Sequence, residues 1–317
     1  TLHSAPPRLR FIEPVRELGG FHPRCFNPVD PVSRLASRLP SPLACAWLPP
    51  MAAPLPNSGS HLACLGVGEG WPSGSRRHAC FVYQLGSTRI LLDCGDGMST
   101  GFKAGGFDYH ALDAVILSHM HSDHVGGFSM FVQSLWLAER RRPLAIYAPA
   151  QGIPALQAWL NATVLPRELL GFELQWHPLA SSQPFEVGEV RITPHATTHL
   201  QSLQRSFGAR YPDTSFEAFS FTLEHDGLRL GHTADIGAVQ DLLPLLEHPL
   251  SLLVCELSHI EVPDLTALLR RSPPGRVVFV HVARELLADA TALEARLRTE
   301  LNGIPFVLAH DDDLVAL

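Results

Sequence analysis

Three histidines and one aspartate lie within the six residues from His119 to His124. Imidazole nitrogens and carboxylate oxygens together suit zinc or a similar first-row divalent metal. The spacing allows His119 and His121 to hold one ion, while Asp123 and His124 point to a second ion beside it. A polar loop with a chance cluster is the alternative, because the chain contains 17 histidines. The ordered spacing favours a metal site.

The flanking sequence places this cluster between a strand and a helix. The apolar run at 114–117 predicts a buried strand, and apolar residues from Phe128 to Trp136 recur at helical spacing. The cluster is therefore expected on a strand-to-helix loop, where rigid elements can hold side chains around an ion.

The motif His-x-His-x-Asp-His after a buried strand resembles that of the metallo-β-lactamase superfamily of hydrolases. The resemblance covers roughly residues 60 to 317. It implies an α/β fold, a four-layered αβ/βα sandwich with a one- or two-metal site at one edge. The alternation of strands and helices along this region also favours two αβ halves that face each other.

The resemblance implies three further metal ligands after late strands, and the chain offers His199, Asp235 and His281. Asp235 takes the place of a carboxylate that bridges two metals. His195 competes with His199, but the family's ligand usually lies several residues beyond the strand end, which favours His199. His232 is interpreted as a packing histidine. The complete set implies two divalent ions, most simply zinc, with manganese or iron as alternatives.

Two aspartates receive further roles. The stretch 91–95 resembles the family's strand that ends beneath the metals, so Asp93 is expected to orient ligands through hydrogen bonds. A plain strand cap is the alternative for Asp93. Asp123 is expected to exchange a proton near a hydroxide held by two ions, provided that it binds metal through one oxygen. The chain is thus expected to be a metal-dependent hydrolase.

The stretches 65–68 and 93–97 resemble the opening of the ribonuclease Z and phosphodiesterase branch. A phosphodiesterase-like reaction on a small-molecule or nucleotide substrate is favoured. The alternatives are a lactonase, thioesterase or β-lactamase-type acyl hydrolase and, less favoured, an iron-dependent dioxygenase. The segment 200–216, with Arg205 and Arg210, is a candidate lid or specificity loop. His259 is a candidate general acid, although a structural role is favoured.

Composition narrows the classes of partner. The net charge of -7 argues only weakly against a dedicated nucleic-acid binder, which would normally present a basic surface, and a local basic patch that binds nucleic acid stays an open alternative. No apolar run approaches the length of a membrane helix, so no membrane partner is expected, and a homodimer stays an open alternative. Reduced thiols in the cytoplasm are expected, because no C-x-x-C pair occurs among the scattered cysteines, Cys25, Cys45, Cys64, Cys80, Cys94 and Cys255.

Residues 1–57 differ in composition from the rest and hold 12 of the 27 prolines. Their lack of periodicity predicts a flexible Pro/Arg-rich extension, followed by a hydrolase domain at 58–317. Met51 is a candidate natural start, and a processed targeting segment is the disfavoured alternative because acidic residues are present. Within the domain, helices are expected at 153–162, 263–271 and 284–299.

Overall fold

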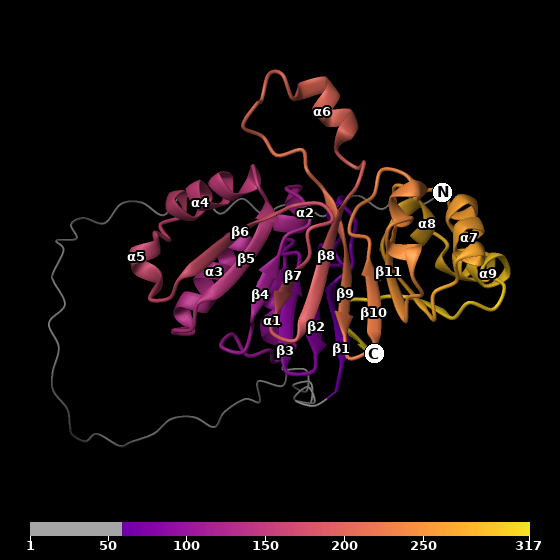
Figure 1. Ribbon diagram of the computed structural model, residues 1–317, viewed down its shortest axis with the longest axis horizontal. Helices are drawn as coiled ribbons and strands as arrows, with labels where there is room; N and C mark the ends of the chain where they lie inside the picture. Colours follow the sequence, from indigo (N-terminus) through magenta and orange to yellow (C-terminus); the bar gives the residue numbers. More distant parts are fainter. Residues whose placement is uncertain (1–58) are drawn as a thin grey trace, which may run out of the picture. The chain divides into compact units, whose positions relative to one another are not determined.

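The computed structural model describes residues 59–317, and the expected extension at 1–57 lies outside these residues. The described chain forms two seven-stranded sheets with helices on their outer faces (Figure 1). This arrangement is the four-layered αβ/βα sandwich that the sequence predicted. No helix within 59–317 combines the length and apolar character needed to cross a membrane.

The first sheet has the strand order β14-β1-β2-β3-β4-β5-β6. The first four strands in this order, β14 to β3, pair antiparallel, and the strands from β3 to β6 pair parallel. Its strands are β1 His61–Gly66, β2 Cys80–Leu85, β3 Thr88–Leu92, β4 Ala114–Ile116, β5 Leu144–Pro149, β6 Leu174–Leu179 and β14 Asp313–Ala316. The helices in this half are α1 Met98–Ala104, α2 Ser122–Val125, α3 Phe128–Leu137, α4 Gly152–Ala162 and α5 Arg167–Leu170.

The second sheet has the order β13-β12-β11-β10-β9-β8-β7. Its strands are β7 Phe185–Val187, β8 Val190–Ala196, β9 Phe219–His225, β10 Leu228–His232, β11 Leu252–Leu257, β12 Val277–Val282 and β13 Phe306–Leu308. Its helices are α6 Gln201–Phe207, α7 Val262–Arg271, α8 Arg284–Leu287 and α9 Ala290–Glu300, with the 3-10 turns η1 Val239–Leu242 and η2 Leu245–Glu247.

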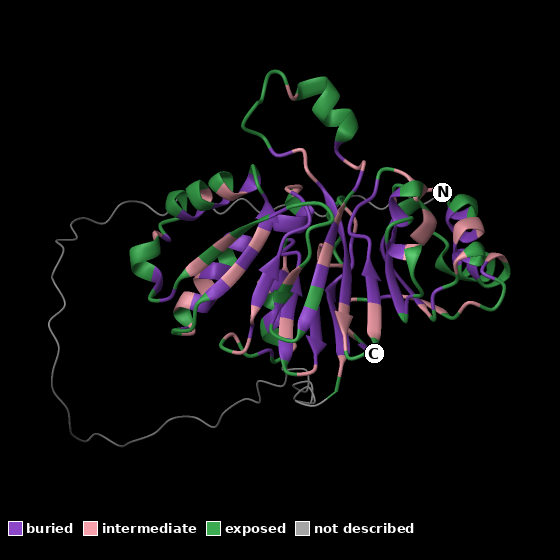
Figure 2. Cartoon of the chain, in the orientation of Figure 1, coloured by how far each residue is buried: buried purple, intermediate pink, exposed green. Residues whose placement is uncertain are grey.

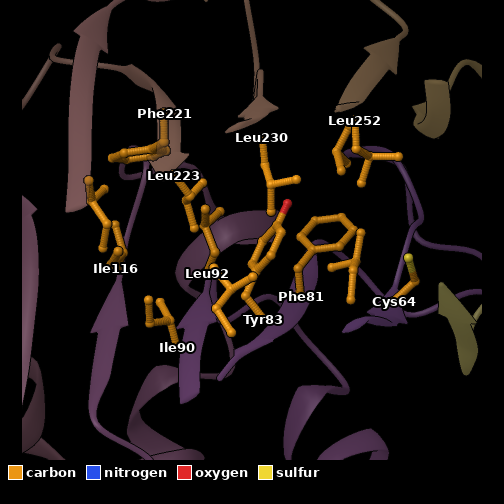
Figure 3. Packing of buried hydrophobic residues seen from close by; sticks show 14 of the residues in the cluster. Cys64, Phe81, Tyr83, Ile90, Leu92, Ile116, Phe221, Leu223, Leu230 and Leu252 are labelled. Carbon is orange, nitrogen blue, oxygen red and sulfur yellow. The ribbon is translucent and has the colours of Figure 1, made fainter. Parts of the chain in front are cut away.

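One apolar cluster fills the space between the sheets. Because alternate residues of a strand point to opposite faces, Phe81 and Tyr83 of β2 enter this cluster, whereas Val82 joins the cluster beneath the helices of the first half. Figure 3 shows Phe81, Tyr83 and other side chains of the first sheet facing the second, which contributes Phe221, Leu223, Leu230 and Leu252. Burial of one such aromatic ring stabilises the fold by roughly 2 kcal/mol.

Burial follows the layers closely (Figure 2). The strands are mostly buried, and the helices expose their outer faces. Helix α6 differs, because it projects beyond the sheets and none of its residues is buried. The cysteines of the described region are all free and buried, as the sequence predicted: Cys64, Cys80, Cys94 and Cys255.

Three local expectations need correction. The expected loop at 122–125 is the short helix α2, which carries Asp123 and His124. The expected helix at 284–299 is broken into α8 and α9, because Asp289 caps a new helix by accepting a hydrogen bond from the Ala292 amide at 2.9 Å. The expected loop at 200–216 contains α6.

Candidate metal centre

The segments that follow β3, β4, β8 and β10 meet the end of β12 at one edge of the two sheets. Three residues at these strand ends have left-handed backbone conformations: Asp93 with φ 60°, Ala234 with φ 45° and His281 with φ 47°. Such conformations cost residues other than glycine roughly 1–3 kcal/mol each and tend to gather at functional sites. The surrounding fold therefore holds this edge in a strained geometry.

The first group of ligand-type side chains contains His119, His121, His199 and Asp235, whose nitrogen and oxygen atoms all lie within 4.8 Å of one another. His119 and His121 come from the segment between β4 and α2, and His199 comes from the segment after β8. The distance between His121 Nδ1 and His199 Nε2 is 3.2 Å. These atoms are close enough to share one cation.

The second group contains Asp123, His124, Asp235 and His281 within the same limit of 4.8 Å. Asp123 Oδ2 lies 3.2 Å from His281 Nε2 and 3.5 Å from His124 Nε2. Asp123 and His124 come from α2, while His281 comes from β12. This group can hold a second cation.

Asp235 belongs to both groups, and its two oxygens divide between them. Oδ2 lies 3.5 Å from His199 Nε2 and 3.8 Å from His119 Nε2. Oδ1 lies 3.3 Å from His124 Nε2 and 3.6 Å from His281 Nε2. A single carboxylate therefore faces two sets of imidazoles, one with each oxygen.

Hydrogen bonds behind the ligands fix the orientation of three imidazoles. Asp93 accepts a hydrogen bond from His124 Nδ1 at 2.7 Å and two more from Ser118, through its amide and its hydroxyl. The same Ser118 hydroxyl lies 3.0 Å from His119 Nδ1, and the Ser258 hydroxyl lies 2.8 Å from His281 Nδ1. Each contact leaves the Nε2 atom pointing to the centre, which is the usual arrangement behind metal-binding histidines.

The charges of the centre favour a cation. Burial lowers the pKa of His119 well below its ordinary value and that of His199 to about 4, so both imidazoles are neutral near pH 7 and keep a lone pair for coordination. Burial opposes the charge on His124, yet Asp235 and Asp93 raise its pKa well above the ordinary value. The carboxylates thus favour positive charge here, which a divalent cation supplies as well as a proton does.

Unpaired polar atoms support the same conclusion. Among the residues that the structure describes, His119 Nε2, His124 Nε2 and Asp235 Oδ1 are buried without any hydrogen-bond partner. Burying such atoms unpaired costs about 1–3 kcal/mol each. All three point into the two groups, so a metal ion would satisfy them together, and the donor set fits two divalent ions.

A cavity of about 310 Å³ opens from this centre, lined in part by His121, Asp123, Asp235, His259 and His281. The loop between β1 and β2 passes directly over it. A Cβ atom on Gly70 of this loop would lie 3.3 Å from Asp123 Oδ2, a tight contact that would push the carboxylate by a few tenths of an ångström.

Glu256 and His259 form a third group at the rim, together with His281. Glu256 is fully buried, and its Oε1 atom accepts hydrogen bonds at 2.9 Å from the Ile236 amide and from His259 Nδ1. Burial opposes protonation of His259, but the hydrogen bond and charge of Glu256 raise its pKa to about 9. Glu256 therefore fixes both the loop that carries Asp235 and the ring of His259.

Comparison with known proteins gives this geometry a family. The model of the "Beta-lactamase superfamily domain" matches residues 88–282, which is more than half of the chain. The metallo-β-lactamase fold protein YhfI from Bacillus subtilis superposes with a TM-score of 0.63 at 18% identity, over 80% of this chain and 98% of that chain. The chain belongs to the metallo-β-lactamase superfamily.

Within this superfamily, the curated relatives place the chain in the ribonuclease Z and phosphodiesterase-like branch, as the sequence predicted. Ribonuclease Z from Aeropyrum pernix is 30% identical over 129 residues, which are 40% of this chain and 40% of that protein. The chain therefore matches less than half the length of this relative. Zinc-bound PqqB from Methylobacterium extorquens shares the fold, with a TM-score of 0.62 at 17% identity over 81% of this chain and 100% of that chain.

The structure of this chain brings together every ligand candidate that the sequence singled out: His119, His121, Asp123, His124, His199, Asp235 and His281. His195 lies apart from them, within β8, and its Nε2 atom is 2.9 Å from the Thr222 hydroxyl. Sequence reasoning missed the orienting hydroxyls of Ser118 and Ser258. Ser118 directly precedes the motif and Ser258 follows Glu256, but no pattern in one sequence distinguishes such serines from loop serines.

Proposed function

We propose that the protein is a metal-dependent hydrolase of the phosphodiesterase-like kind, which binds two divalent ions. The observation that carries the proposal is the division of the Asp235 carboxylate, with one oxygen facing His119 and His199 and the other facing His124 and His281. A carboxylate in this position can link two neighbouring cations and offset part of their charge.

The proposed assignment gives each ion a separate set of ligands. His119, His121 and His199 hold the first ion, and Asp123, His124 and His281 hold the second, with Asp235 shared between them. Zinc suits imidazole and carboxylate ligands, and the structural similarity to a zinc-bound protein of the same fold supports zinc here. Two such ions lower the pKa of a bound water and stabilise negative charge on a reacting phosphoryl or carbonyl oxygen.

The chain's own residues perform the remaining tasks. Asp123 directs Oδ2 towards His124 and His281, so Oδ1 is assigned the proton from the attacking water. The pKa of Asp123 is lowered despite its burial, because His281 and His124 stabilise the carboxylate, so Asp123 is ionised near neutral pH. His259 lines the cavity with Nδ1 held by Glu256, which leaves Nε2 to donate a hydrogen bond to the leaving oxygen.

The relatives' name supports a phosphodiester as the bond that is cleaved, because ribonuclease Z proteins of several organisms match this chain. Bis-p-nitrophenyl phosphate is therefore the expected substrate in a panel that also contains a lactone and a thioester. Faster cleavage of the lactone or thioester would move the activity to the acyl hydrolases of the same superfamily.

The test of the two-metal proposal is a titration of activity against metal bound per chain. Chelation should abolish hydrolysis of bis-p-nitrophenyl phosphate, and zinc or manganese should restore it. Asp235→Asn keeps the shape of the side chain but removes its charge, so we expect weaker binding of both ions and at least a hundredfold lower kcat.

Asp113→Asn is the matched control for this substitution. Asp113 is a partly buried aspartate that pairs with Arg142 and the Arg89 amide, away from the centre. The control should keep metal content and kcat. Full activity in metal-free protein, or in Asp235→Asn, would contradict the proposal.

A further inference from the structure

A second hollow adjoins the cavity of the metal centre. It has a volume of about 410 Å³, and Trp71, Pro72 and Ser73 contribute to its lining. Glu69 and Arg284 line both this hollow and the cavity at the centre, so the two share a wall. A substrate whose reacting bond lies at the centre would extend past this wall into the second hollow.

Trp71 offers an unusual surface there. Its side chain is 64% exposed, although indole is among the largest apolar side chains in the protein. The guanidinium of Arg284 lies over the ring, with Cζ 4.7 Å from the ring centroid, which supports the indole by a cation–π contact. One face of the indole is thereby supported while the side chain as a whole stays open to a ligand.

The loop that carries Trp71 is anchored at several points. Glu69 accepts a hydrogen bond from the Trp71 amide at 3.1 Å, and Asp311 accepts one from the Arg77 amide at 2.6 Å. The Gly68 amide also donates to the Arg77 carbonyl at 2.8 Å, which closes the base of the loop. Because neighbouring Gly70 passes against Asp123, the anchored loop places the backbone of Trp71 close to the centre.

We propose that the second hollow binds the base of a nucleoside phosphate, which stacks on Trp71 while its phosphate lies at the metal centre. This inference rests on the proposed function, since it names the substrate class of that same site. A planar heteroaromatic ring is the ligand that an exposed indole recognises best, because every base presents a π-face for stacking. Arg284 is 55% exposed, lines both hollows and pairs with Glu285 at 2.9 Å, so its remaining N–H groups are the donors available between ring and phosphate.

Calorimetric titration of the zinc-supplied full chain tests the proposal without requiring turnover. The ligands are adenosine 5′-monophosphate and ribose 5-phosphate, which share sugar and phosphate but differ in the base. We expect the nucleotide to bind about tenfold more tightly, because loss of one base–aromatic stack weakens binding by roughly fivefold or more. Trp71→Ala should remove this preference, and Trp71→Phe should keep most of it.

Leu137→Ala serves as the control, because Leu137 is 61% exposed but belongs to α3, outside both hollows. It should keep the preference for the nucleotide. Equal dissociation constants for the two ligands in the unaltered chain, or an unchanged preference in Trp71→Ala, would overturn the proposal. Absence of measurable nucleotide binding would overturn it as well.

A third ligand, a trinucleotide that ends in adenosine, distinguishes a free nucleotide from the end of an RNA. Binding of either ligand supports the stacking site. A trinucleotide that binds more tightly than the mononucleotide would identify the end of an RNA as the ligand. The outcome is separate from that of the hydrolysis test. Hydrolysis without base preference would support the proposed function and reject this inference. Base preference without hydrolysis would support the stacking site and reject the proposed function.

Discussion

At the scale of single residues, the position of a histidine relative to its strand decides whether its side chain reaches the metal centre. His199 and His195 are four positions apart, yet one faces His121 at 3.2 Å and the other contacts Thr222 at 2.9 Å. The end of β8 explains the difference. His195 is still part of the strand, so the strand fixes the side to which its side chain points, whereas His199 lies three residues beyond the strand end. Leaving the strand allows a side chain to turn towards the centre.

Substitution of these two histidines should therefore have unequal effects. His199→Ala removes one of three proposed imidazole ligands of the first ion, so we expect about one zinc less per chain and at least a hundredfold loss of kcat. His195→Ala should change kcat less than threefold and leave the zinc content unchanged. Metal analysis together with kinetics checks the ranking, and the reverse order would show that His195 is the ligand.

His232 gives a prediction for stability. Burial, and then the charge of His124, lowers the pKa of His232 to about 3, and its Nδ1 atom is 2.8 Å from the Tyr83 hydroxyl. An unfolded imidazole has a pKa near 6.5, so between these values the unfolded chain binds the additional proton. The free energy of unfolding should consequently fall as pH drops below 6.5, with this residue contributing on the order of 1 kcal/mol per pH unit.

Urea unfolding of chelator-treated protein at pH 7 and pH 5 measures this contribution. His232→Asn keeps an acceptor for the Tyr83 hydroxyl but has no proton to gain in this range. The variant should lose less free energy of unfolding between the two pH values than the unaltered chain. Parallel losses would mean that other groups account for the whole pH dependence.

At the scale of elements, the sequence predicted most of the framework. Strong apolar runs such as those of β4 and β12 are fully buried and lie where they were expected. The failures are short elements and boundaries, as in the break before α9, which one capping hydrogen bond from the Ala292 amide to Asp289 decides. Helix α2 escaped prediction for a related reason, since four residues give no periodicity and their conformation depends on contacts with 94–95.

These contacts lead to a prediction at Gly95. The Cys94 amide donates to the His124 carbonyl at 2.7 Å, which holds α2 against the segment after β3. A Cβ atom on Gly95 would overlap the Asp123 carbonyl oxygen and approach His78 Cβ to 2.7 Å. Gly95→Ala should therefore displace α2, lower the free energy of unfolding by about 1–3 kcal/mol and weaken the second ion more than the first.

Denaturant unfolding and zinc titration of the variant measure the two effects. Gly74→Ala is the control, because a Cβ atom there meets nothing within 4 Å. Its free energy of unfolding should stay within about 0.5 kcal/mol of that of the unaltered chain. Normal zinc binding in Gly95→Ala would show that α2 tolerates the shift.

At the scale of the whole molecule, each proposed ion is held by both halves of the sandwich. The first half supplies His119 and His121 to one ion and α2 to the other, while the second half supplies His199 and His281. The sequence indicated this ligand set only through its order along the chain. Single histidines after apolar strands are too common to identify a site, and only the packing of the two sheets brings them within one coordination sphere.

We predict that residues 1–50 are dispensable for folding and metal binding. Residues 59–317 by themselves supply the three apolar clusters and both groups of ligands. A chain that begins at Met51 should therefore keep its zinc content and its kcat for bis-p-nitrophenyl phosphate. Its free energy of unfolding should lie within about 0.5 kcal/mol of that of the full chain, the range expected of a change away from the packed core and the ligands. A truncated chain that aggregates, or that binds less zinc per chain under the same conditions, would show that the first 50 residues support the domain.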